Sequence, residues 1–489
     1  MPENQIWYFR RKRRSIQNNK KSLASLFSWF GRFIKSEEVH TAIRKSPRAF
    51  VRKYKFPWYD VLLFLIFRCR KCLGSELSQY YSHIGLSQLR ISRQAAFKAI
   101  QKVDPSVFKL LIHRLAKHFY QSDLVKTYKG YLLLAEDGTT LNLYKTNESL
   151  QRYGWVFNQY TPNEEKAKKA TSRSAALYDV TNGLIVDFTM RRFKDSEIPI
   201  AIEQLESIPL LQGYSAIYLA DRYYNSVELF SILESYGLKY CVRGKSNFFK
   251  HYLENMKTND EWIQVKIDRA WQGRLKYTQP RERFSRDPYI NIRIVKNNYD
   301  IYRNGKQESV NLIYFTNLSR EEFDSKDIMH LYSKRWEIET GYKTLKTDLE
   351  WERYFSKDCD SETCSIYAKV VFHNLSGILR KEMDEELIEK NSEANKYNYQ
   401  INWKQLNELI RDEKVVRWIR NENRGRIDKM IDLIKALINK IKVPVRPNRH
   451  YKRWNRIIKQ GKPMRFRLDG REWPNTRPHN GALMTMPPS

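Results

Sequence analysis

The sequence predicts an α/β fold, in which a mixed sheet with flanking helices is interrupted by an all-β insertion and bounded by helical regions. Three observations predict it. Apolar runs of strand length alternate with amphipathic runs of helix length between residues 131 and 244. A polar stretch with period-two alternation follows at 245–310, and helical patterns occupy both ends. The expected divisions are 1–125, 126–245 (core), 246–318 (β-rich insertion), 319–385 (core) and 386–489.

The first division, residues 1–125, is expected to be helical and basic. SELSQYYSHIG (75–85) and ISRQAAFKAIQKV (91–103) are amphipathic segments separated by a turn, and Ser92 suits the N-cap of the second. The pair at 75–103 is similar to a helix-turn-helix. Its recognition helix would present Arg93, Gln94 and Lys98 to DNA. Any helical hairpin gives the same pattern, so a purely structural hairpin stays an alternative.

The core is expected to run β, ββ, α, β, α, β along the chain. Two strands, YLLLAED (131–137) and SAIYLAD (215–221), are continuous apolar runs that end in an aspartate. Thr181-Asn182-Gly183 is a strong turn signal between two further strands. The other expected elements are strands 174–180, 183–192, 238–244 and 311–317 and helices 197–208, 225–237 and 361–383.

The charge predicts a polyanionic partner. The chain has 88 Lys and Arg against 55 Asp and Glu, which gives a formal net charge of +33. Residues 1–55 carry 15 basic and 3 acidic residues, and residues 442–489 carry 12 and 2. Such a field attracts nucleic acid, which we favour over an anionic membrane surface. Solvated basic tails are the plainer explanation of the two ends.

Membrane and secretory classes are not expected. The longest apolar run, VLLFLIF at 61–67, is far shorter than the roughly 20 residues that a spanning helix needs. The start of the chain has charges but no apolar signal segment. Five cysteines, a small and odd number, favour a reducing cytosol over a disulfide framework.

Two aspartates and a glutamate form a candidate metal site. Asp137 and Asp221 end their predicted strands, and ligands collect at the carboxyl ends of strands in open α/β sheets. Mg²⁺ favours carboxylate oxygens together with water and substrate phosphate. Glu339, from a helix packed beside them, would complete a ligand set that suits two-metal cleavage of phosphodiesters. Taken singly, each aspartate could equally end a strand or cap a turn.

The stretch YSKRWEIETGYKTLK (332–346) predicts a helix with an unusual face. Steps of three, four, three and four residues return to one face of a helix. That face is normally apolar, but here it carries two phenols, two cations and one carboxylate. Its members are Tyr332, Arg335, Glu339, Tyr342 and Lys346. They form either a solvated ion-pair network or a metal ligand beside groups that grip a polyanion.

These residues resemble the DDE transposases of bacterial insertion sequences, in particular the group with a Y-x2-R-x3-E-x6-K signature. The signature is met without a gap by Tyr332, Arg335, Glu339 and Lys346. The two other acids match in context, as AEDGTTL around Asp137 and YLADRYYNS around Asp221. The resemblance covers roughly residues 130–380. It implies an RNase H-like core with a β insertion before the glutamate helix.

The resemblance implies roles for these side chains. The catalytic residues and metal ligands would be Asp137, Asp221 and Glu339. They would bind two Mg²⁺ ions, which Mn²⁺ could replace. The phosphates at the transposon end would be held by Tyr332, Arg335 and Lys346. Arg222, next to the second acid, could also meet phosphate, whereas Tyr342 lies outside the signature and is expected to pack.

Members of this group nick DNA and use the freed 3′ hydroxyl to form a hairpin on the transposon end. A tight hairpin extrudes a base, which an aromatic side chain of the insertion can hold. Trp262 and Trp271 are the candidates, and either could instead pack the insertion. The resemblance also implies double-stranded DNA as partner, a homodimer in the synaptic complex and a place at the nucleoid in a bacterial cytoplasm.

The leading hypothesis is a cut-and-paste transposase that binds the terminal inverted repeats of its insertion sequence, cleaves there and transfers strands into target DNA. A first alternative is a catalytically silent, domesticated DNA-binding protein or regulator, which has no need to keep three acids. A second is a structure-selective nuclease on the same RNase H-like scaffold. Such a nuclease would need neither the Tyr-Arg-Lys grip nor the inserted domain.

Overall fold

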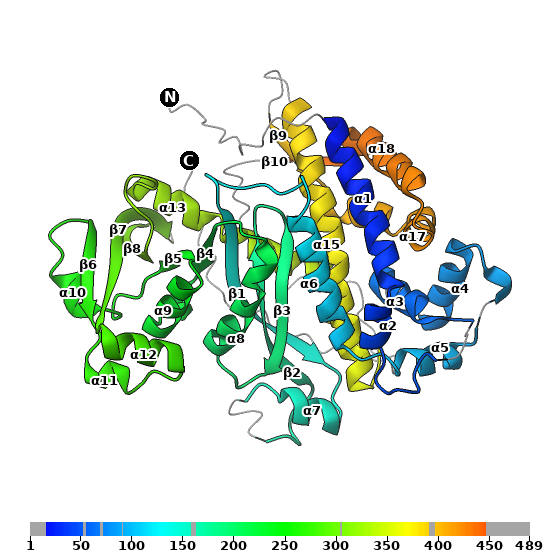
Figure 1. Ribbon diagram of the computed structural model, residues 1–489, viewed down its shortest axis with the longest axis horizontal. Helices are drawn as coiled ribbons and strands as arrows, with labels where there is room; N and C mark the ends of the chain where they lie inside the picture. The colour runs from blue at the N-terminus through cyan, green and yellow to red at the C-terminus, as the bar shows by residue number, and fades with distance from the viewer. Residues whose placement is uncertain are drawn as a thin grey trace. The chain divides into compact units, whose positions relative to one another are not determined.

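The computed structural model describes residues 16–51, 55–68, 72–89, 91–157, 163–303, 306–390 and 397–445 (Figure 1). The chain forms two compact units. The described residues of the first lie within Met1–Ser22, Ile112–Leu141 and Ser172–Lys343, and those of the second within Leu23–Leu111, Asn142–Thr171 and Thr344–Ser489.

The first unit is built on one mixed sheet. Its strands are β1 (Leu132–Leu143), β2 (Ala170–Asp179), β3 (Leu184–Arg192), β4 (Ala216–Ala220), β5 (Lys239–Arg243), β6 (Asp260–Lys266), β7 (Tyr289–Arg303) and β8 (Lys306–Thr316). They lie in the order β3-β2-β1-β4-β5-β8-β7-β6. β4 is parallel to both β1 and β5. The pairs β2–β3, β5–β8, β7–β8 and β6–β7 are antiparallel.

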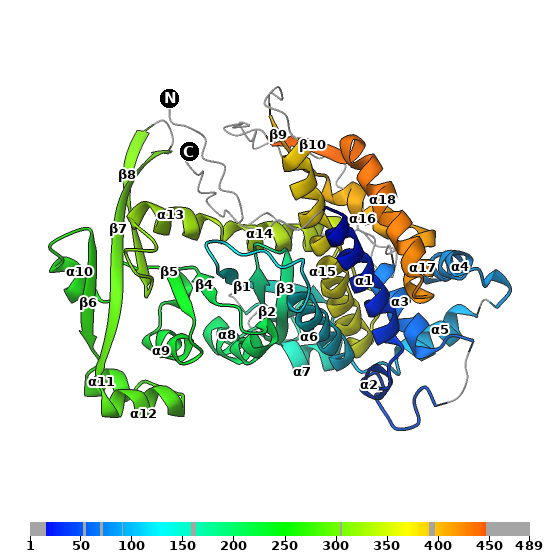
Figure 2. The same ribbon diagram turned by 45° about the horizontal axis from the view of Figure 1, so that its top comes forward.

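Helices cover both faces of this sheet (Figure 2). The helices of this unit are α8 (Glu197–Gln204), η2 (Leu205–Leu211), η3 (Arg222–Tyr224), α9 (Val227–Ser235), α10 (Lys250–Glu254), α11 (Arg269–Gln272), α12 (Thr278–Arg286), α13 (Ser325–Ser333) and α14 (Trp336–Lys343). α8 and α9 pack against β3 and β5, and α13 packs on the other side against β5 and β7. The predicted order β, ββ, α, β, α, β corresponds to β1, β2–β3, α8, β4, α9 and β5, with one unpredicted helix between β1 and β2.

The turn between β2 and β3 forms as its sequence predicts. Gly183 has a φ of 69°, a left-handed conformation that glycine adopts without strain. The carboxylate of Asp179 accepts from the backbone N–H groups of Thr181 and Asn182, both at 3.1 Å. The hydroxyl of Tyr120, at the end of α6 (Ser106–Tyr120), donates to the other oxygen of Asp179 at 3.0 Å. The hairpin is thus anchored from outside the sheet as well.

The expectation of an all-β insertion at 246–318 is wrong, because this stretch also contains α10, α11 and α12. Alternating runs predicted only the strands. Asp268 caps α11 by accepting from the backbone N–H of Trp271 at 2.9 Å. Phe284 is fully buried on α12, which packs against α9. The strands β6, β7 and β8 extend the core sheet itself, through the antiparallel pairing of β8 with β5.

The expectation of one continuous helix over 332–346 is also wrong. α13 ends at Ser333 and α14 begins at Trp336, and the intervening backbone N–H groups of Lys334 and Arg335 bond three residues back. Such bonds mark a tighter, 3₁₀-like turn. After α14 the chain forms the π-helical segment η4 (Thr344–Asp348), closed by a bond from Leu349 N–H to the carbonyl of Thr344. The tightening accompanies burial of Arg335, whose guanidinium contacts two acids.

β1 is longer than predicted. It continues through Asp137 to Leu143, so this aspartate does not end its strand. Helix α7 (Asn147–Tyr153) then follows, which the sequence reasoning missed. Its signal was present, since Thr146 and Ser149 form a reciprocal capping box at its start.

The second unit is mainly helical. Its helices are α7, α2 (Glu37–Ala42), α3 (Trp58–Phe67), α4 (Leu73–His83), η1 (Ser87–Leu89), α5 (Arg93–Ile100), α15 (Cys359–Lys390), α16 (Trp403–Ile410), α17 (Glu413–Arg420) and α18 (Arg424–Ile441). The residues of α1 (Ile16–Ile34) and α6 are divided between the two units. α3 is buried along most of its length and packs on α15. A short antiparallel pair, β9 (Asn398–Ile401) and β10 (Lys442–Val445), interrupts a C-terminal region expected to be helical.

The two helices expected at 75–85 and 91–103 are present as α4 and α5. Ser92 caps α5 as expected, because its hydroxyl accepts from the backbone N–H of Ala95 at 3.1 Å. Much of the two basic ends, 1–15 and 446–489, lies outside the described residues. Among the helices that the structure describes, none is long and apolar enough to cross a membrane.

Candidate active site

Asp137 and Asp221 meet because their strands are parallel neighbours. The last paired positions of β1 and β4 are Glu136 and Ala220. Each aspartate is the next residue along the chain, so both stand at the same end of the parallel pairing. Asp221 also caps η3, since its carboxylate accepts from the backbone N–H of Tyr223 at 2.7 Å. The structural role that the sequence left open for Asp221 therefore coexists with its place beside Asp137.

Arg335 links the first acid to the third. Its Nη2 donates to Glu339 Oε1 at 2.8 Å, and its Nη1 lies 3.9 Å from Asp137 Oδ2. Its guanidinium carbon is 5.6 Å from the ring centroid of Tyr332, and that ring lies 5.1 Å from the ring of Tyr314 on β8. Three signature residues gather here although they do not share one helix.

Tyr342 supports the strand that carries the first acid. Its hydroxyl donates to the backbone carbonyl of Asp137 at 2.6 Å, and its ring is buried. The expectation that Tyr342 packs is consistent with this contact. Since it lies on α14 three residues after Glu339, it fixes α14 against β1 at the level of the acids.

The electrostatics of the group show a shortage of positive charge. Burial raises the pKa of Asp137 to about 7; the Arg335 guanidinium opposes this rise, and the nearby acids Asp221, Glu339 and Glu197 add to it. Burial also raises the pKa of the Tyr332 phenol to about 12, against the pull of Arg335. A carboxylate in such surroundings favours any cation that can enter.

Sequence reasoning missed two acids beside this group. Glu197 opens α8, and its Oε1 accepts from Arg173 Nη1 at 2.9 Å. Glu136 is fully buried, and neither of its carboxylate oxygens has a hydrogen-bond partner among the described residues. Burial raises the pKa of both carboxyls. An acid in the first turn of a helix is common, so no local pattern sets Glu197 apart from other acids of the chain.

The side-chain types at this site suit a hard divalent cation, but their spacing in this structure does not. Within the described residues, no three His, Cys, Asp or Glu side chains stand close enough to ligate one metal ion. Arg335 contacts both Asp137 and Glu339 and lies between them. The donor set nevertheless consists of carboxylate oxygens from β1, β4 and α14, the ligand type that Mg²⁺ prefers. A cation would replace Arg335 as the neutralising partner of these acids.

Comparison with known proteins identifies the family. A model of the transposase DDE domain matches residues 128–375, just over half of the chain. The chain belongs to the DDE transposase family. A cryo-EM structure of the piggyBac transposase synaptic complex with hairpin DNA also matches, with 11% identity, a TM-score of 0.42 and coverage of 91% of this chain and 90% of that chain. No curated protein matches.

Family membership establishes the coarse function. Transposases act on DNA, and the DDE family in general cleaves and transfers it with divalent metals such as Mg²⁺. The resemblance seen in the sequence is confirmed at this level. All three predicted acids lie inside the matched range.

The remaining signature lysine of the transposase lies in the second unit. Lys346 is part of η4, beyond the end of α14. In that unit it lies near Lys169, whose pKa is lowered by burial and, to a smaller extent, by Lys346. Arg222, directly after Asp221, is exposed. Lys346 therefore belongs to the second unit and Arg222 to the first.

The two candidate tryptophans of the transposase differ in their surroundings. Trp262, on β6, leaves 46% of its surface exposed. Trp271, on α11, stacks on Phe249 with ring centroids 5.8 Å apart and meets Phe248 edge-on at the same distance. In the second unit, the predicted recognition residues Arg93, Gln94 and Lys98 are all exposed on α5.

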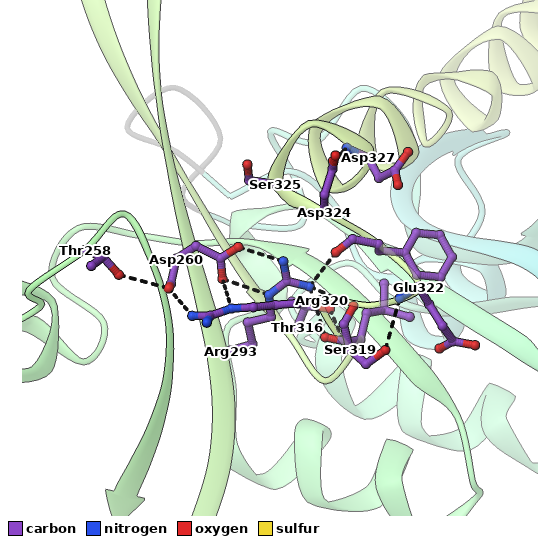
Figure 3. A network of polar contacts seen from close by, with 12 residues as sticks. Thr258, Asp260, Arg293, Thr316, Ser319, Arg320, Glu322, Asp324, Ser325 and Asp327 are labelled. Carbon is purple, nitrogen blue, oxygen red and sulfur yellow. Dashed lines mark hydrogen bonds and ion pairs between the residues drawn. The ribbon is translucent and has the colours of Figure 1, made fainter.

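A network of polar contacts fixes the loop that leads into α13 (Figure 3). Arg293 on β7 is fully buried and donates from Nε and Nη2 to the two carboxylate oxygens of Asp260 on β6, at 2.8 and 2.7 Å. Its Nη1 donates to the carbonyls of Leu318, Ser319 and Phe323 at 3.2, 3.0 and 2.7 Å. The added strands therefore brace the start of the segment that carries Tyr332 and Arg335.

Proposed function

We propose that this transposase is a cut-and-paste enzyme of the Y-x2-R-x3-E-x6-K group of bacterial insertion sequences. It binds the terminal inverted repeats of its element, cleaves the strands there and transfers them into target DNA. The observation that carries the proposal is the convergence of Asp137, Asp221 and Glu339 from three separate elements, with Arg335 in contact with two of them.

The sheet supports an RNase H-like assignment for the core. An antiparallel hairpin, β2–β3, lies on one side of β1, and the parallel strands β4 and β5 lie on the other. The first acid is on β1, between the hairpin and β4, and the second directly follows the parallel neighbour β4. This arrangement presents both acids at one edge of the sheet, where the segment containing Glu339 also arrives.

The three acids would hold two Mg²⁺ ions, with Mn²⁺ as a substitute. When bound, such a pair activates the attacking hydroxyl and stabilises the leaving oxygen of an in-line displacement. The work of the chain is to fix the acids in space. Asp137 is held by its strand and by Tyr342, Asp221 by its cap of η3, and Glu339 by its place on α14.

Arg335 would exchange its carboxylate partners for phosphate. Its guanidinium offers a planar fork that suits phosphate oxygens. In the structure it contacts Asp137 and Glu339, and it would become available to phosphate once a cation neutralises these acids. Tyr332 would support it through the ring contact. Lys346, as a point charge, and the exposed Arg222, as a planar fork, would each contact DNA phosphate.

Trp262 is the better candidate for holding an extruded base in a hairpin. Nearly half of its surface is exposed, whereas Trp271 is occupied by Phe248 and Phe249. A base can stack only on a ring face that the protein leaves open. The exposed residues of α5 would contact the DNA, and two copies of the chain would pair the two ends in the bacterial nucleoid.

A cleavage assay tests this function. The transposase is incubated with a duplex that carries the repeats flanking its own gene, in Mg²⁺ or EDTA, and the strands are resolved on a denaturing gel. We expect cleavage at the repeat boundary in Mg²⁺ only, and a fold-back product if the hairpin step occurs. Glu339→Gln should abolish both, whereas Glu337→Gln on the same helix should cleave like the wild type.

The other outcomes separate the alternatives. Binding to the repeats without cleavage, equal in the wild type and Glu339→Gln, would leave a silent DNA-binding protein. Metal-dependent cleavage of branched or flapped DNA that ignores the repeats, with no strand joining, would indicate a structure-selective nuclease. Either result would overturn the proposal of cut-and-paste transposition.

A further inference from the structure

Glu197 touches the segments that carry both aspartates. A Cβ placed on Gly138, the residue after Asp137, would lie only 2.1 to 2.4 Å from the three atoms of the Glu197 carboxyl group. On its other side, Glu197 Oε2 accepts from the hydroxyl of Tyr224 at 3.3 Å, and Tyr224 ends the short helix that Asp221 caps. The carboxylate of Glu197 therefore lies against β1 and the turn after β4 at once.

The position of Glu197 is enclosed rather than peripheral. Its side chain is 15% exposed, and its one ion-pair partner among the described residues is Arg173 on β2. An ordinary helix-opening acid faces solvent, where it needs no partner. Here the helix N-terminus directs the acid inward, onto the glycine beside the first metal ligand.

The acids around Glu197 outnumber the arginines that contact them. Asp137, Asp221, Glu339 and Glu197 are accompanied by Arg335 and Arg173. Behind them, the fully buried Glu136 has no hydrogen-bond partner for either carboxylate oxygen within the described part of the chain. Buried polar atoms are normally paired. Because burial raises the pKa of Glu136 and so favours its neutral form, the surplus of negative charge rests on the other four acids.

We propose that Glu197 is a fourth acidic residue of the metal site, which supplies an oxygen, directly or through a metal-bound water, to the cation held by Asp137 and Asp221. This inference rests on the proposed metal-dependent function. Glycine at position 138 is then explained, because any side chain there would displace the Glu197 carboxylate. Arg173 orients the acid through Oε1, while Tyr224 holds Oε2 and connects it to the segment of Asp221.

Metal binding tests the proposal without depending on activity. Mn²⁺ is titrated into the full-length protein in the absence of DNA, and free Mn²⁺ is followed by its electron paramagnetic resonance signal. We expect Glu197→Gln to weaken Mn²⁺ binding by about 10- to 100-fold, the usual effect of losing a supporting group of a metal site. Glu203→Gln is the matched control, since Glu203 lies on the same helix and pairs with exposed Arg191.

A second variant tests the proposal even if Glu197→Gln does not fold. Gly138→Ala leaves Glu197 in the chain but pushes its flexible end away, so it should weaken Mn²⁺ binding in the same direction. Melting temperatures in EDTA accompany both titrations. A purely structural role predicts that Glu197→Gln lowers the melting temperature and leaves Mn²⁺ affinity at the wild-type value, and that result would overturn the inference.

Asp137→Asn separates a failure of the Glu197 inference from a failure of the proposed metal site. If it abolishes Mn²⁺ binding while Glu197→Gln and Gly138→Ala bind like the wild type, Glu197 is not part of the site but the proposed function survives. If Asp137→Asn also binds Mn²⁺ like the wild type, the metal site itself is wrong and both proposals fall.

Discussion

The acidic cluster of the first unit and the charged interior of the second differ in whether their charges are balanced. In the second unit, Arg68 and Glu76 expose only 4% and 3% of their side chains and pair at 2.6 Å. Lys369, also buried, donates to the backbone carbonyl of Arg68 at 2.6 Å. Asp60 is buried too, and it accepts two bonds from Arg420 at 2.6 and 3.0 Å.

In the first unit the acids outnumber the cations around them. Asp137 and Glu339 share Arg335, Glu197 has Arg173, and Asp221 adds a further carboxylate beside Asp137. Buried charges that find partners within the chain hold a fold together, whereas a surplus of one sign marks a place prepared for a ligand. The difference suggests that loss of a charge should harm stability in the second unit and function in the first.

The largest expected effect is on catalysis. Asp221→Asn removes a proposed metal ligand but retains an oxygen that can still accept from Tyr223 N–H. We expect cleavage to fall by about 10⁴-fold, the scale seen when a catalytic group is removed, while the melting temperature in EDTA stays within a few degrees of the wild type. If Asp221→Asn instead lowers the melting temperature strongly, and cleavage falls only in proportion to the folded fraction, Asp221 acts mainly as the cap of η3.

Breaking a balanced pair in the second unit should instead cost stability. Glu76→Gln leaves Arg68 charged and buried without its carboxylate. We expect a loss of about 3–5 kcal/mol in the free energy of unfolding, the usual result of removing one partner of a buried pair. Denaturant unfolding followed by circular dichroism measures it.

The double variant Arg68→Met with Glu76→Leu is the control for this pair. Because it removes both charges and fills the space with apolar atoms, it should regain most of the lost stability. If the double variant is as unstable as Glu76→Gln, packing rather than charge balance governs this interior, and the contrast between the units is weakened.

A third prediction concerns pH and the second unit. Burial, with a smaller effect of nearby Arg380, lowers the pKa of His373 to about 3, and its ring stacks on Trp403 at 5.3 Å. The folded state therefore holds this imidazole neutral, and its contribution is complete above the unfolded pKa of about 6.5 and lost as pH falls below it. At pH 5 the loss should be about 2 kcal/mol by linkage.

The measurement compares unfolding free energies at pH 7 and pH 5. His373→Gln should be less stable than the wild type at pH 7 but lose about 2 kcal/mol less on going to pH 5. His251→Gln, whose side chain is exposed on α10, should keep the wild-type difference. An unchanged pH difference in His373→Gln would mean that His373 does not contribute to acid sensitivity.

The sequence predicted those parts of the fold that local patterns determine. The strands that lead to Asp137 and Asp221 are apolar runs of strand length, and the Thr181-Asn182-Gly183 turn needs only the left-handed preference of glycine and a capping aspartate. The family signature located Glu339 and Arg335. Their contact is also local, because residues four apart meet on any helical turn.

What the sequence did not predict depends on long-range contacts. Steps of three and four residues fit a continuous α-helix and a helix broken by a 3₁₀-like turn equally well, so the break at Lys334 and Arg335 was invisible. The approach of Glu197 to Gly138 joins residues 59 positions apart. The helices of the insertion, such as α12, are stabilised by burial of single residues like Phe284, which leaves no periodic signal.

The smallest predicted effect is the sharpest test of the comparison. Asp137→Asn removes one of several crowded acids and keeps the backbone carbonyl that accepts from Tyr342. In EDTA it should raise the free energy of unfolding by about 0.5–2 kcal/mol, as neutral replacements at charged active sites commonly do. In millimolar Mg²⁺ the order of stability should reverse, because bound cation stabilises only the wild type.

Melting curves of both proteins in both buffers measure this reversal of their relative stability. If Asp137→Asn is less stable than the wild type in EDTA, Arg335 already balances the acids, and the charge surplus does not exist.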